Sequence, residues 1–289
     1  MKIGILILAH SQPEQLKRLV GILKKDFEIF IHIDKRSEIP MDLFSKDNNV
    51  HLISQYPTYW GSLNFVLATV ELLKRAYEEQ CDYYLCISGS DIPIRKNEEI
   101  IAAIEKTKDA NYMSYTPLPF KDWSLRGGLD RFQLYFENIK NPTKLSLFNW
   151  MCRAGRQVQK RICRRKLYPL PYYGGSNWFD LTKETVAYVL DFLRKNPNYI
   201  RSFRHTLSSD EVFFQTIVLN SPFSQQTINK TRRYIDWETG PERPRVLQEV
   251  DFEKIIVAPD VFFARKVTLD FFTQYERLCN TKRKDSSSI

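Results

Sequence analysis

Two adjacent cations close an apolar run near the C-terminal end of the chain. The run is PDVFFARKV, and its charged residues are Arg265 and Lys266. An arginine can offer two parallel hydrogen bonds to a phosphate group, and a lysine adds a compact positive charge. The pair could therefore hold a phosphorylated ligand in the way that a metal ion does in other enzymes.

A carboxylate suited to acid–base chemistry occurs in the segment TLSSDEVFFQTIVLNS. We predict a helix here with Ser208 or Ser209 as its cap. Its first turn would hold Asp210 and Glu211, an ordinary place for acids because the helix dipole favours them. Glu211 also borders an apolar helix face, where partial desolvation would raise its pKa toward the range of a general base. These residues alone leave a structural and a catalytic role open.

The elements that must position these groups are strands and helices that alternate through the first third of the chain. Apolar runs typical of buried strands occur at 2–9, 27–34, 49–54 and 82–88. Helical periodicity occurs at 13–25 and 62–79. This alternation indicates an α/β fold, with a mostly parallel central sheet and helices on both faces.

Polar or glycine-containing segments follow these strands, where ligands bind in such sheets. The segments are 9–11, 34–36, 59–62 and 88–91. Together they suit one nucleotide-sized pocket. Asp34 could accept a hydrogen bond from the imide N–H of uracil, or it could pair with Lys35 or Arg36. The single aspartate of 88–91 is a poor site for a divalent cation, because a second carboxylate is missing.

Three features of the second half could also contact a ligand. Gly174 and Gly175 either close a tight loop or let a ligand approach the backbone. Asn177 and Asp180 lie on opposite sides of the strand that follows, so at most one of them faces a given pocket. Trp237 ends RRYIDW before a loop rich in glycine and proline, and it is either a platform for a sugar or a core residue.

Composition and motifs argue against several classes of site. The 289 residues carry a formal net charge of +9, which favours anionic partners. Five cysteines without a CxxC and four histidines without an HExxH argue against a disulfide framework and a metal centre. The sequence contains neither GxGxxG nor GxxxxGK[ST], which argues against a dinucleotide site and a P-loop.

The chain has no apolar run of 18 residues, so we expect no membrane-spanning helix and a cytoplasmic protein. The segment 153–166 carries seven cations and no acid. It is either a solvated helix face or part of a peripheral contact, through 147–166, with the inner face of a membrane or with a lipid diphosphate. Because zinc-finger and RNP-type motifs are missing, we expect no nucleic-acid partner.

Eight segments together resemble glycosyltransferase family 14, which contains the core-2/I-branching N-acetylglucosaminyltransferases and the peptide O-xylosyltransferases. In chain order they are IHIDKRS, YWGSLNFVLATVELL, YYLCISGSDIPIRKNEEI, GGLDRF, YYGGSNWFDLT, DEVFFQTIVLNSP, YIDW and FFARKV. Each segment is weak alone, but their order makes the resemblance specific over nearly the whole chain. Several details are similar to the xylosyltransferase branch, and the whole looks like a bacterial member.

This resemblance implies a fold, a domain layout and a reaction. The fold would be a Rossmann-like fold of the GT-A type, in a single domain of residues 1–280. Residues 1–120 would bind the nucleotide, and 121–280 would provide the acceptor and catalytic half. We predict that the tail 281–289 is disordered. The reaction would be inverting transfer of a sugar, GlcNAc or xylose, from a UDP-sugar to a hydroxyl of a glycan or lipid-linked glycan, without a metal or another cofactor.

The resemblance also assigns roles to individual residues. Glu211 matches the catalytic base. The residues matched to nucleotide-sugar binding are Ala9, Asp34, Trp60, Arg265 and Lys266. Asn177 and Trp237 are expected to contact the acceptor, although Asn177 stands where the xylosyltransferase branch has aspartate. The alternatives are a non-catalytic nucleotide-sugar- or glycan-binding protein with the same fold, and a basic nucleic-acid-binding protein.

Overall fold

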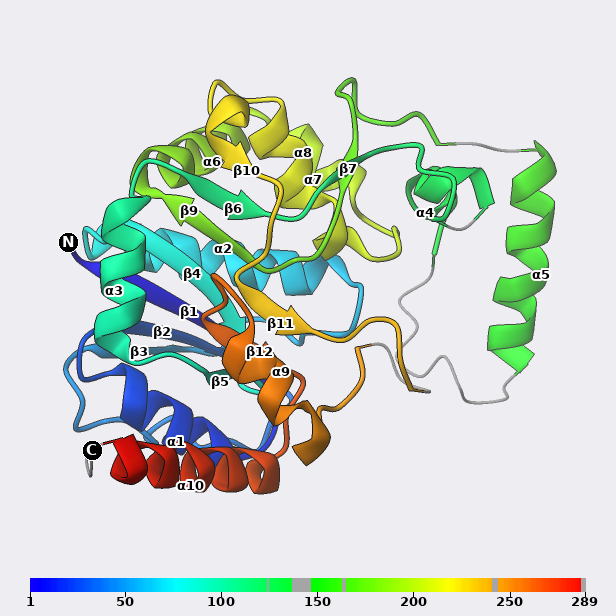
Figure 1. Ribbon diagram of the computed structural model, residues 1–289. Coiled ribbons are helices and arrows are strands. Elements are labelled where there is room, and N and C mark those ends of the chain that lie inside the picture. The colour runs from blue at the N-terminus through cyan, green and yellow to red at the C-terminus, as the bar shows by residue number, and fades with distance from the viewer. Residues whose placement is uncertain (124, 137–146, 163–164, 241–243, 287–289) are drawn as a thin grey trace.

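A computed structural model of the chain is built around a seven-stranded sheet (Figure 1). The structure describes residues 1–123, 125–136, 147–162, 165–240 and 244–286. The strands of this sheet are β1 (Ile3–Ala9), β2 (Glu28–Ile33), β3 (Val50–Ile53), β4 (Tyr83–Ser88), β6 (Asn111–Met113), β9 (Phe179–Thr182) and β10 (Thr227–Ile228). They lie in the order β10-β6-β9-β4-β1-β2-β3, and only β9 runs antiparallel to its neighbours β4 and β6.

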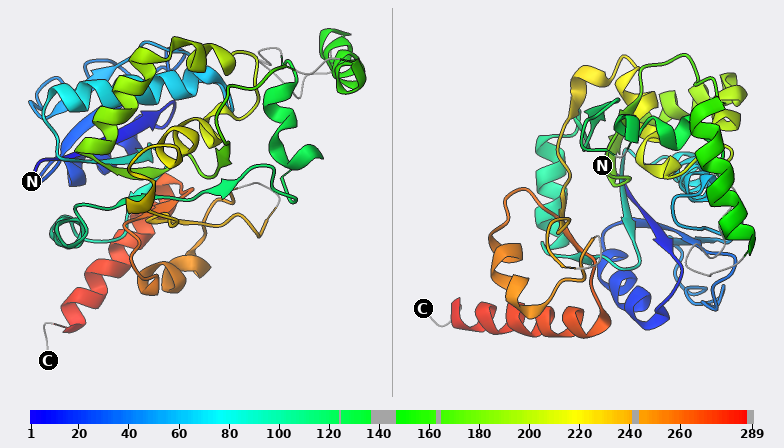
Figure 2. Two further views of the ribbon diagram at one scale, coloured as in Figure 1. Left: turned by 90° about the horizontal axis from the view of Figure 1, so that it is seen from above. Right: turned by 90° about the vertical axis from the view of Figure 1, so that its right-hand side faces the viewer.

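Helices cover both faces of the sheet (Figures 1 and 2). One face carries α1 (Pro13–Leu23), α3 (Asn97–Lys106), α9 (Phe252–Val257) and α10 (Leu269–Ser286). The other carries α2 (Leu63–Glu78), α6 (Lys183–Lys195), α7 (Pro197–Ser202) and α8 (Phe213–Leu219). Side chains of β1 alternate between these layers, with Ile5 and Ile7 on the first face and Leu6 and Leu8 on the second. The predicted α/β fold of the GT-A, Rossmann-like type is thereby confirmed.

The predicted strands and helices of the first third are confirmed to within two residues at each end. For example, the helix predicted at 13–25 is α1, which begins at Pro13. Proline suits the first position of a helix because the N–H that it lacks would have no helical partner there. The strand predicted at 82–88 is β4, and its six residues are all buried. Local periodicity was sufficient here because each element faces the core on a regular side.

A second, three-stranded sheet joins the two halves of the chain. Its strands are β5 (Ile92–Pro93), β11 (Arg233–Ile235) and β12 (Phe263–Arg265). β12 pairs with β11 in parallel and with β5 antiparallel. Since Ala264 is opposite Ile92, the next residue, Arg265, lies beside the turn that follows β4. The small sheet thus brings the C-terminal cations to the carboxyl end of the central sheet.

The remaining elements lie around these two sheets. They are β7 (Thr116–Pro117) paired with β8 (Tyr173–Gly174), α4 (Asp130–Gln133), α5 (Leu147–Ile162) and the 3₁₀ turns η1 (Leu125–Gly128), η2 (Ser209–Glu211), η3 (Ser224–Gln226) and η4 (Glu249–Asp251). The long helix α5 lies at the periphery of the molecule in Figure 1, and hydrogen bonds join it to Arg126 and Tyr135.

The C-terminal helix differs from what the sequence predicts. α10 continues to Ser286, whereas we expect a disordered tail over 281–289. Lysine and arginine are good helix formers, so the helix extends through the charged residues; residues 287–289 lie outside the described part. The division of 1–280 into two functional halves stays a prediction. Within the described residues, no helix has the length and apolar character needed to cross a membrane.

His32 fixes the loop after β3 to the end of β2. Its ring is 1% exposed, and its Nε2 accepts a hydrogen bond from Tyr56 N at 3.2 Å. An accepting ring nitrogen must be unprotonated. Burial is the main reason why the pKa of His32 falls to about 4. The same loop supplies Thr58 to the candidate site described below, so the neutral histidine supports that site.

We expect the free energy of unfolding to decrease as the pH falls from 6.5, the ordinary histidine pKa, toward 4. In this window the unfolded chain binds a proton at His32 that the folded chain does not bind. The contribution is fully present above pH 6.5 and is lost as the pH falls through the folded pKa of about 4. The loss should be on the order of 3 kcal/mol.

Urea denaturation of wild type and His32→Gln at a series of pH values would measure this dependence. In His32→Gln the free energy of unfolding should no longer decrease in this way between pH 6.5 and 4. His205→Gln, at an exposed histidine, should show the same decrease as wild type. An identical slope in wild type and His32→Gln would contradict the assignment.

Candidate active site

The carboxyl ends of β1, β2 and β4 meet at one edge of the central sheet. Asp34 N donates to Ala9 O at 2.8 Å, and Gly89 N donates to Leu8 O at 3.0 Å. The predicted proximity of these strand ends is confirmed. Ala9 itself is buried at 4% exposure, so the exposed side chain at the end of β1 belongs to the next residue, His10.

Asp34 is buried and its carboxylate is fully hydrogen-bonded. Oδ1 accepts from Arg36 N at 2.8 Å and from Arg36 Nε at 3.1 Å. Oδ2 accepts from Arg36 Nη2 at 2.7 Å and from Thr58 N and Oγ1 at 3.1 and 2.7 Å. Burial opposes ionisation, but these bonds outweigh it and lower the pKa of Asp34 to about 2.

The expected ion pair between Asp34 and Arg36 is therefore present. A carboxylate has about four acceptor positions, and five donors already occupy those of Asp34. A uracil N–H could bind this carboxylate only by displacing Thr58 or Arg36. The geometry thus favours a positioning role for Asp34, which fixes the guanidinium of Arg36 at the strand end.

The loop after β3 connects this cluster to the segment that carries Glu211. The guanidinium of Arg36 lies 3.9 Å from the ring centroid of Tyr59. Trp60 follows and is 78% exposed, so its indole stands at the rim and not in a closed pocket. Gly61 has φ 67°, and a Cβ built on it would lie 3.0 Å from Ser208 N. The loop therefore packs closely against the chain just before Glu211.

Arg265 is held between buried partners at the end of β12. Its guanidinium lies 3.8 Å from the centroid of the Trp178 ring. Its Nε is 3.6 Å from Oδ1 of Asp91, which is fully buried and also accepts from Ser88 Oγ at 2.7 Å. Burial lowers the pKa of Arg265, and Asp91 opposes that effect. Within the described residues, Nε and Nη1 of Arg265 are buried and have no hydrogen-bond partner.

Positive charge continues from Arg265 to its neighbours. Lys266 is half-buried. Although the side chain of His10 is exposed at the surface, partial desolvation by its surroundings lowers its pKa; the charge of Asp34 opposes this shift, while those of Lys266, Arg36 and Arg265 add to it. Since electrostatic effects weaken with distance, these charges surround the end of β1. His10 is uncharged at neutral pH, and the site's positive charge comes from the arginines and Lys266.

Glu211 lies in a 3₁₀ turn and not in the first turn of the apolar helix. Ser208 adopts φ 55° and ψ 47°, so the chain forms η2 first and begins α8 only at Phe213. Neither element has a side-chain cap, so the predicted serine cap is wrong. The physical reason is that Gly175 N donates to Glu211 O at 2.8 Å and takes the carbonyl that a continuous helix would use.

The carboxylate of Glu211 is partly buried and paired. Its side chain is 28% exposed, and Oε2 accepts from Arg131 Nη1 at 2.6 Å. Burial raises the pKa of Glu211, while Arg131 counteracts this effect. The neighbouring Asp210 has a buried Oδ1 without a partner among the described residues. Burial, and then the charge of Glu211, raise the pKa of Asp210 to about 7. Two adjacent carboxyl groups thus have pKa values above their ordinary ones.

The segment 175–178 joins the carboxylate to the cations. Gly175 is bonded to the backbone of Glu211, and Trp178 stacks against Arg265. Three residues of chain span at most about 11 Å. Glu211 and Arg265 therefore flank the same short segment, and the half-buried Asn177 lies between them.

The paired glycines serve close packing within the chain. A Cβ on Gly174 would lie 2.3 Å from the Trp123 ring, and one on Gly175 would lie 1.9 Å from Ser114 O. The same Trp123 ring supports the guanidinium of Arg131 at 4.9 Å. The glycines thus let the loop descend between Trp123 and the strand region, which brings Gly175 to Glu211.

Trp237 lies close in sequence to the strand that pairs with Arg265, and it is outside the core. Its side chain is 44% exposed, so the alternative of a core tryptophan is wrong. It follows Ile235, the partner of Arg265 in the β11–β12 pair, by two residues. Asp236 between them accepts hydrogen bonds from Thr239 and from Arg245 Nε at 2.9 Å, which fix the start of the loop.

Comparison with known proteins identifies the family of this chain. The sequence model of the family described as Core-2/I-Branching enzyme matches residues 4–256. The chain belongs to this family.

Two curated relatives are xylosyltransferases. The chain is 27% identical over 248 residues to xylosyltransferase 2 of Rattus norvegicus, covering 82% of this chain and 27% of that protein. It is 25% identical over 251 residues to xylosyltransferase 1 of Mus musculus, covering 82% and 24%. The chain spans about a quarter of the length of these relatives. The predicted resemblance to glycosyltransferase family 14 is confirmed, while a bacterial origin stays a prediction.

Among solved structures, the 4-diphosphocytidyl-2C-methyl-D-erythritol synthase of Anaerococcus prevotii is 16% identical, with a TM-score of 0.35. The match covers 68% of this chain and 75% of that one. A likeness of this size carries no argument about the function of the Core-2/I-Branching chain.

One group of potential metal ligands occurs among the described residues of this family member, and it lies away from the candidate site. Glu28, His51 and Glu79 bring ligand atoms within 4.8 Å of one another. Lys2 Nζ is 3.4 Å from Glu28 and 3.8 Å from Glu79, so an ammonium already balances these carboxylates. Glu28 is the first residue of β2, whereas the candidate site lies beyond its last.

Sequence reasoning did not assign a role to three residues of the candidate site in this family member. His10 follows a predicted strand end, and its position was the available signal. Asp91 was considered only as a metal ligand, yet it attracts Arg265. Arg131 occurs in GGLDRF, and its pairing with Glu211 across 80 residues left no local trace in the sequence.

Proposed function

We propose that this Core-2/I-Branching chain is a glycosyltransferase that moves a sugar from a UDP-sugar to a hydroxyl of a glycan or lipid-linked glycan. One observation carries the proposal. A partly buried carboxylate, Glu211, and the cations Arg265 and Lys266 flank one four-residue segment at the carboxyl edge of the sheet. Because its curated relatives are named xylosyltransferases, xylose is one donor sugar to test, and GlcNAc is the other.

The donor would bind beyond the ends of β1, β2 and β4, where Arg36 and His10 line the edge. Its diphosphate would face Arg265 and Lys266. Stacking on Trp178 keeps the guanidinium of Arg265 in place, and its positive charge would attract the phosphate oxygens. As the bond from C1 to the diphosphate breaks, negative charge grows on the leaving group, and the two cations stabilise it. We propose that these cations make a metal ion unnecessary.

Glu211 would accept the proton of the acceptor hydroxyl as that oxygen attacks C1 from the opposite side. Its pKa is raised by burial, so it is a stronger base than an exposed glutamate. The pairing with Arg131 keeps it ionised and oriented before the acceptor binds. A single displacement inverts the configuration at C1, and an α-linked donor gives a β-linked product. Asn177 lies beside the reacting groups, and Trp237 lies at the edge where an acceptor sugar would stack.

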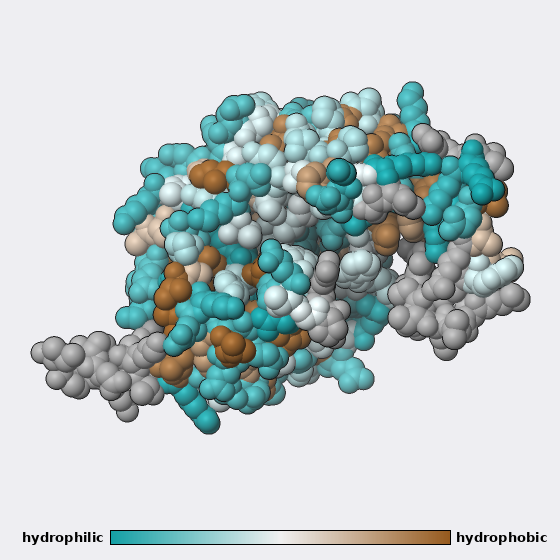
Figure 3. Space-filling view, turned by 45° about the vertical axis from the view of Figure 1, so that its right-hand side comes forward, coloured by the Kyte–Doolittle hydropathy of each residue, from teal (hydrophilic) through white to brown (hydrophobic). Residues whose placement is uncertain are grey.

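Helix α5 supports a peripheral membrane contact. Its exposed apolar side chains, Trp150, Met151, Ala154 and Val158, follow one face of the helix. Its other face is held by the body, since Gln159 Oε1 accepts from Tyr135 N at 2.8 Å. In Figure 3 the arm that carries α5 projects to the right, with hydrophilic and hydrophobic side chains on its surface. Apolar side chains beside many cations are typical of a helix that lies on an anionic membrane.

We expect Glu211→Gln to lower sugar transfer at least a hundredfold while UDP binding is unchanged, since a general base typically contributes about 10²–10⁴-fold. UDP release from UDP-xylose and UDP-GlcNAc, with a panel of glycan acceptors, would measure turnover.

Glu253→Gln, at an exposed position of α9, is the matched control and should keep wild-type turnover. Turnover of Glu211→Gln above about a tenth of wild type would exclude Glu211 as the base. The same assay in EDTA tests metal independence, and loss of activity there would refute it. UDP binding without turnover of any donor would favour the non-catalytic alternative.

We expect Lys266→Ala to weaken UDP binding about tenfold, because it removes a charge that would face the diphosphate. Folding should change little, since the side chain is half-buried. Calorimetric titration with UDP measures the affinity, and Lys254→Ala on α9 is the matched control. An unchanged affinity in Lys266→Ala would remove this lysine from the donor site.

We expect the chain to sediment with vesicles that contain phosphatidylglycerol, and less so at high salt, which screens charge. Replacement of Trp150 and Val158 by serine should abolish this binding. Replacement of Val250 and Val257, both 75% exposed, by serine should not. Equal sedimentation of the two double variants would show that α5 does not mediate the contact.

A further inference from the structure

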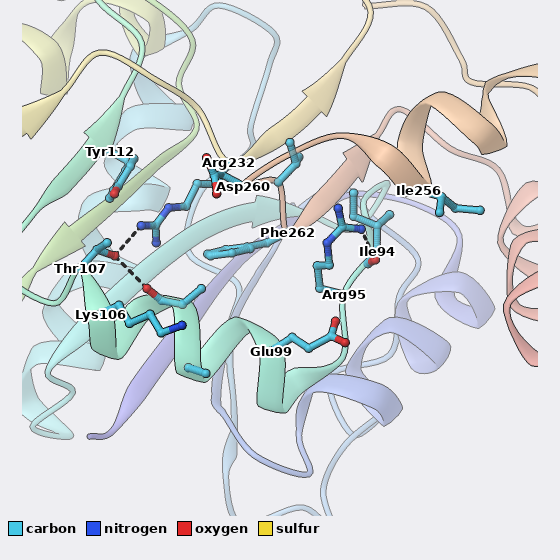
Figure 4. A pocket seen from close by; sticks show the side chains of 13 residues that line it. Ile94, Arg95, Glu99, Lys106, Thr107, Tyr112, Arg232, Ile256, Asp260 and Phe262 are labelled. Atoms are coloured by element: carbon cyan, nitrogen blue, oxygen red, sulfur yellow. Dashed lines mark hydrogen bonds between the residues drawn. The ribbon is translucent and has the colours of Figure 1, made fainter. Parts of the chain in front are cut away.

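A groove of about 970 Å³ lies between α3 and the segment 256–262 (Figure 4). Arg232, just before β11, and Phe262, just before β12, line it. In the small sheet, Ile235 and Arg265 at the ends of the same two strands face the candidate active site. The groove therefore lies at the opposite end of the three-stranded sheet from the cations of the donor site.

Arg232 lies at the inner wall of this groove. Its side chain is 3% exposed and is enclosed by rings, with its guanidinium 3.5 Å from the centroid of Tyr112 and 4.8 Å from that of Phe262. Nη2 donates to Thr107 Oγ1 at 2.6 Å, as Figure 4 shows. Nη1 is buried and has no partner among the described residues. A buried guanidinium with a free donor is costly unless an acceptor reaches it.

The buried charge around Arg232 is not balanced. Asp180, fully buried, is bonded to Arg233, which is itself buried. Arg232 Nε is 4.0 Å from the other oxygen of the same carboxylate. Two buried guanidinium groups thus share one carboxylate, which leaves one positive charge in excess. Buried charges are normally paired, so the excess predicts an anion at the accessible side of Arg232, which is the groove.

The groove adds further positive charge and few free acids. Arg95 and Lys106 line it together with Arg232. Of its two acids, Asp260 pairs with Lys230 at 3.0 Å. Glu99 Oε2 accepts from Lys96 N at 3.1 Å, at the start of α3. Arg232 is also near enough to help lower the pKa of Asp260, but that carboxylate is exposed and hydrogen-bonded to Lys230, and Arg232 keeps an unused donor.

We propose that this groove binds a small organic anion, a phosphate or carboxylate on a body of about the size of one sugar. The anionic group would reach Arg232 and Lys106, and the body would rest on the apolar wall formed by Phe262 and Tyr112. The volume lies within the range of about 300–1,000 Å³ typical of small-molecule sites. The inference is independent of the sugar-transfer proposal, because none of its residues belongs to the donor site.

Calorimetric titration of the full chain at constant ionic strength tests the proposal. The probes are inorganic phosphate, glucose 6-phosphate, glucuronate and neutral glucose. Wild type should bind at least one of the three anions at a single site and should not bind glucose. Whichever of glucose 6-phosphate and glucuronate binds with the higher affinity shows whether the site prefers a phosphate or a carboxylate.

Variants then locate the site. Lys106→Gln should lower the affinity for the anion about tenfold, which is the usual effect of losing a hydrogen bond to a charged group. Lys108→Gln, two residues farther along and outside the groove, is the matched control and should bind as wild type does. Arg232→Gln should abolish binding in protein whose circular dichroism shows that it is folded. Lys266→Ala should leave the affinity unchanged.

Two results would overturn the proposal. One is that wild type binds none of the three anions. The other is that Lys266→Ala loses the anion while Lys106→Gln retains it, because the anion would then occupy the strand-end site. The donor site is tested separately, with UDP. If sugar transfer failed, the titrations with small anions would therefore still show whether the groove binds an anion.

Discussion

The position of one guanidinium, that of Arg265, determines how the candidate site is arranged. Pairing of β12 with β5 and β11 brings this residue from the C-terminal part of the chain to the edge of the central sheet. Trp178 restrains its plane by stacking, which uses none of its N–H donors. Asp91 attracts it from 3.6 Å, yet is itself occupied by Ser88. The Ser88 hydroxyl does not remove the charge of Asp91, so this carboxylate both fixes Arg265 and balances its charge, and Lys266 next to it adds a further positive charge.

Much of the fold could be predicted because its first half follows local periodicity. Strand β1 has core on both faces, and helices such as α2 bury one face, so apolar spacing identifies both. The rule that parallel strands end at a common edge then located Ala9 and Asp34 together. The resemblance to the Core-2/I-Branching family added Glu211, Arg265 and Lys266, which local periodicity could not connect. The structure places Glu211 and Arg265 at the two ends of the segment 175–178, with Lys266 next to Arg265, while their catalytic roles stay predictions.

What the sequence could not show are contacts between distant residues. The turn that holds Glu211 departs from the predicted helix because Gly175, 36 positions earlier, takes its carbonyl. Asp34 was expected either to meet a base or to pair with Lys35 or Arg36; the Arg36 pair is present, and the distant Thr58, which the sequence could not indicate, binds the same carboxylate. In the same way, the glycines at 174 and 175 serve the chain's own packing. Each outcome depends on contacts between residues far apart in the sequence, which local propensity does not describe.

The small sheet has a mechanical consequence. β12 has only three residues, and its pairing on both sides makes it a short, stiff rod of about 10 Å. Phe262 stands at one end and the guanidinium of Arg265 at the other. A push on that ring cannot be absorbed by a flexible loop between them, so it must shift the rod or bend it. The ring of Phe262 and the guanidinium of Arg265 are therefore joined by about 10 Å of paired strand, at opposite ends of the three-stranded sheet.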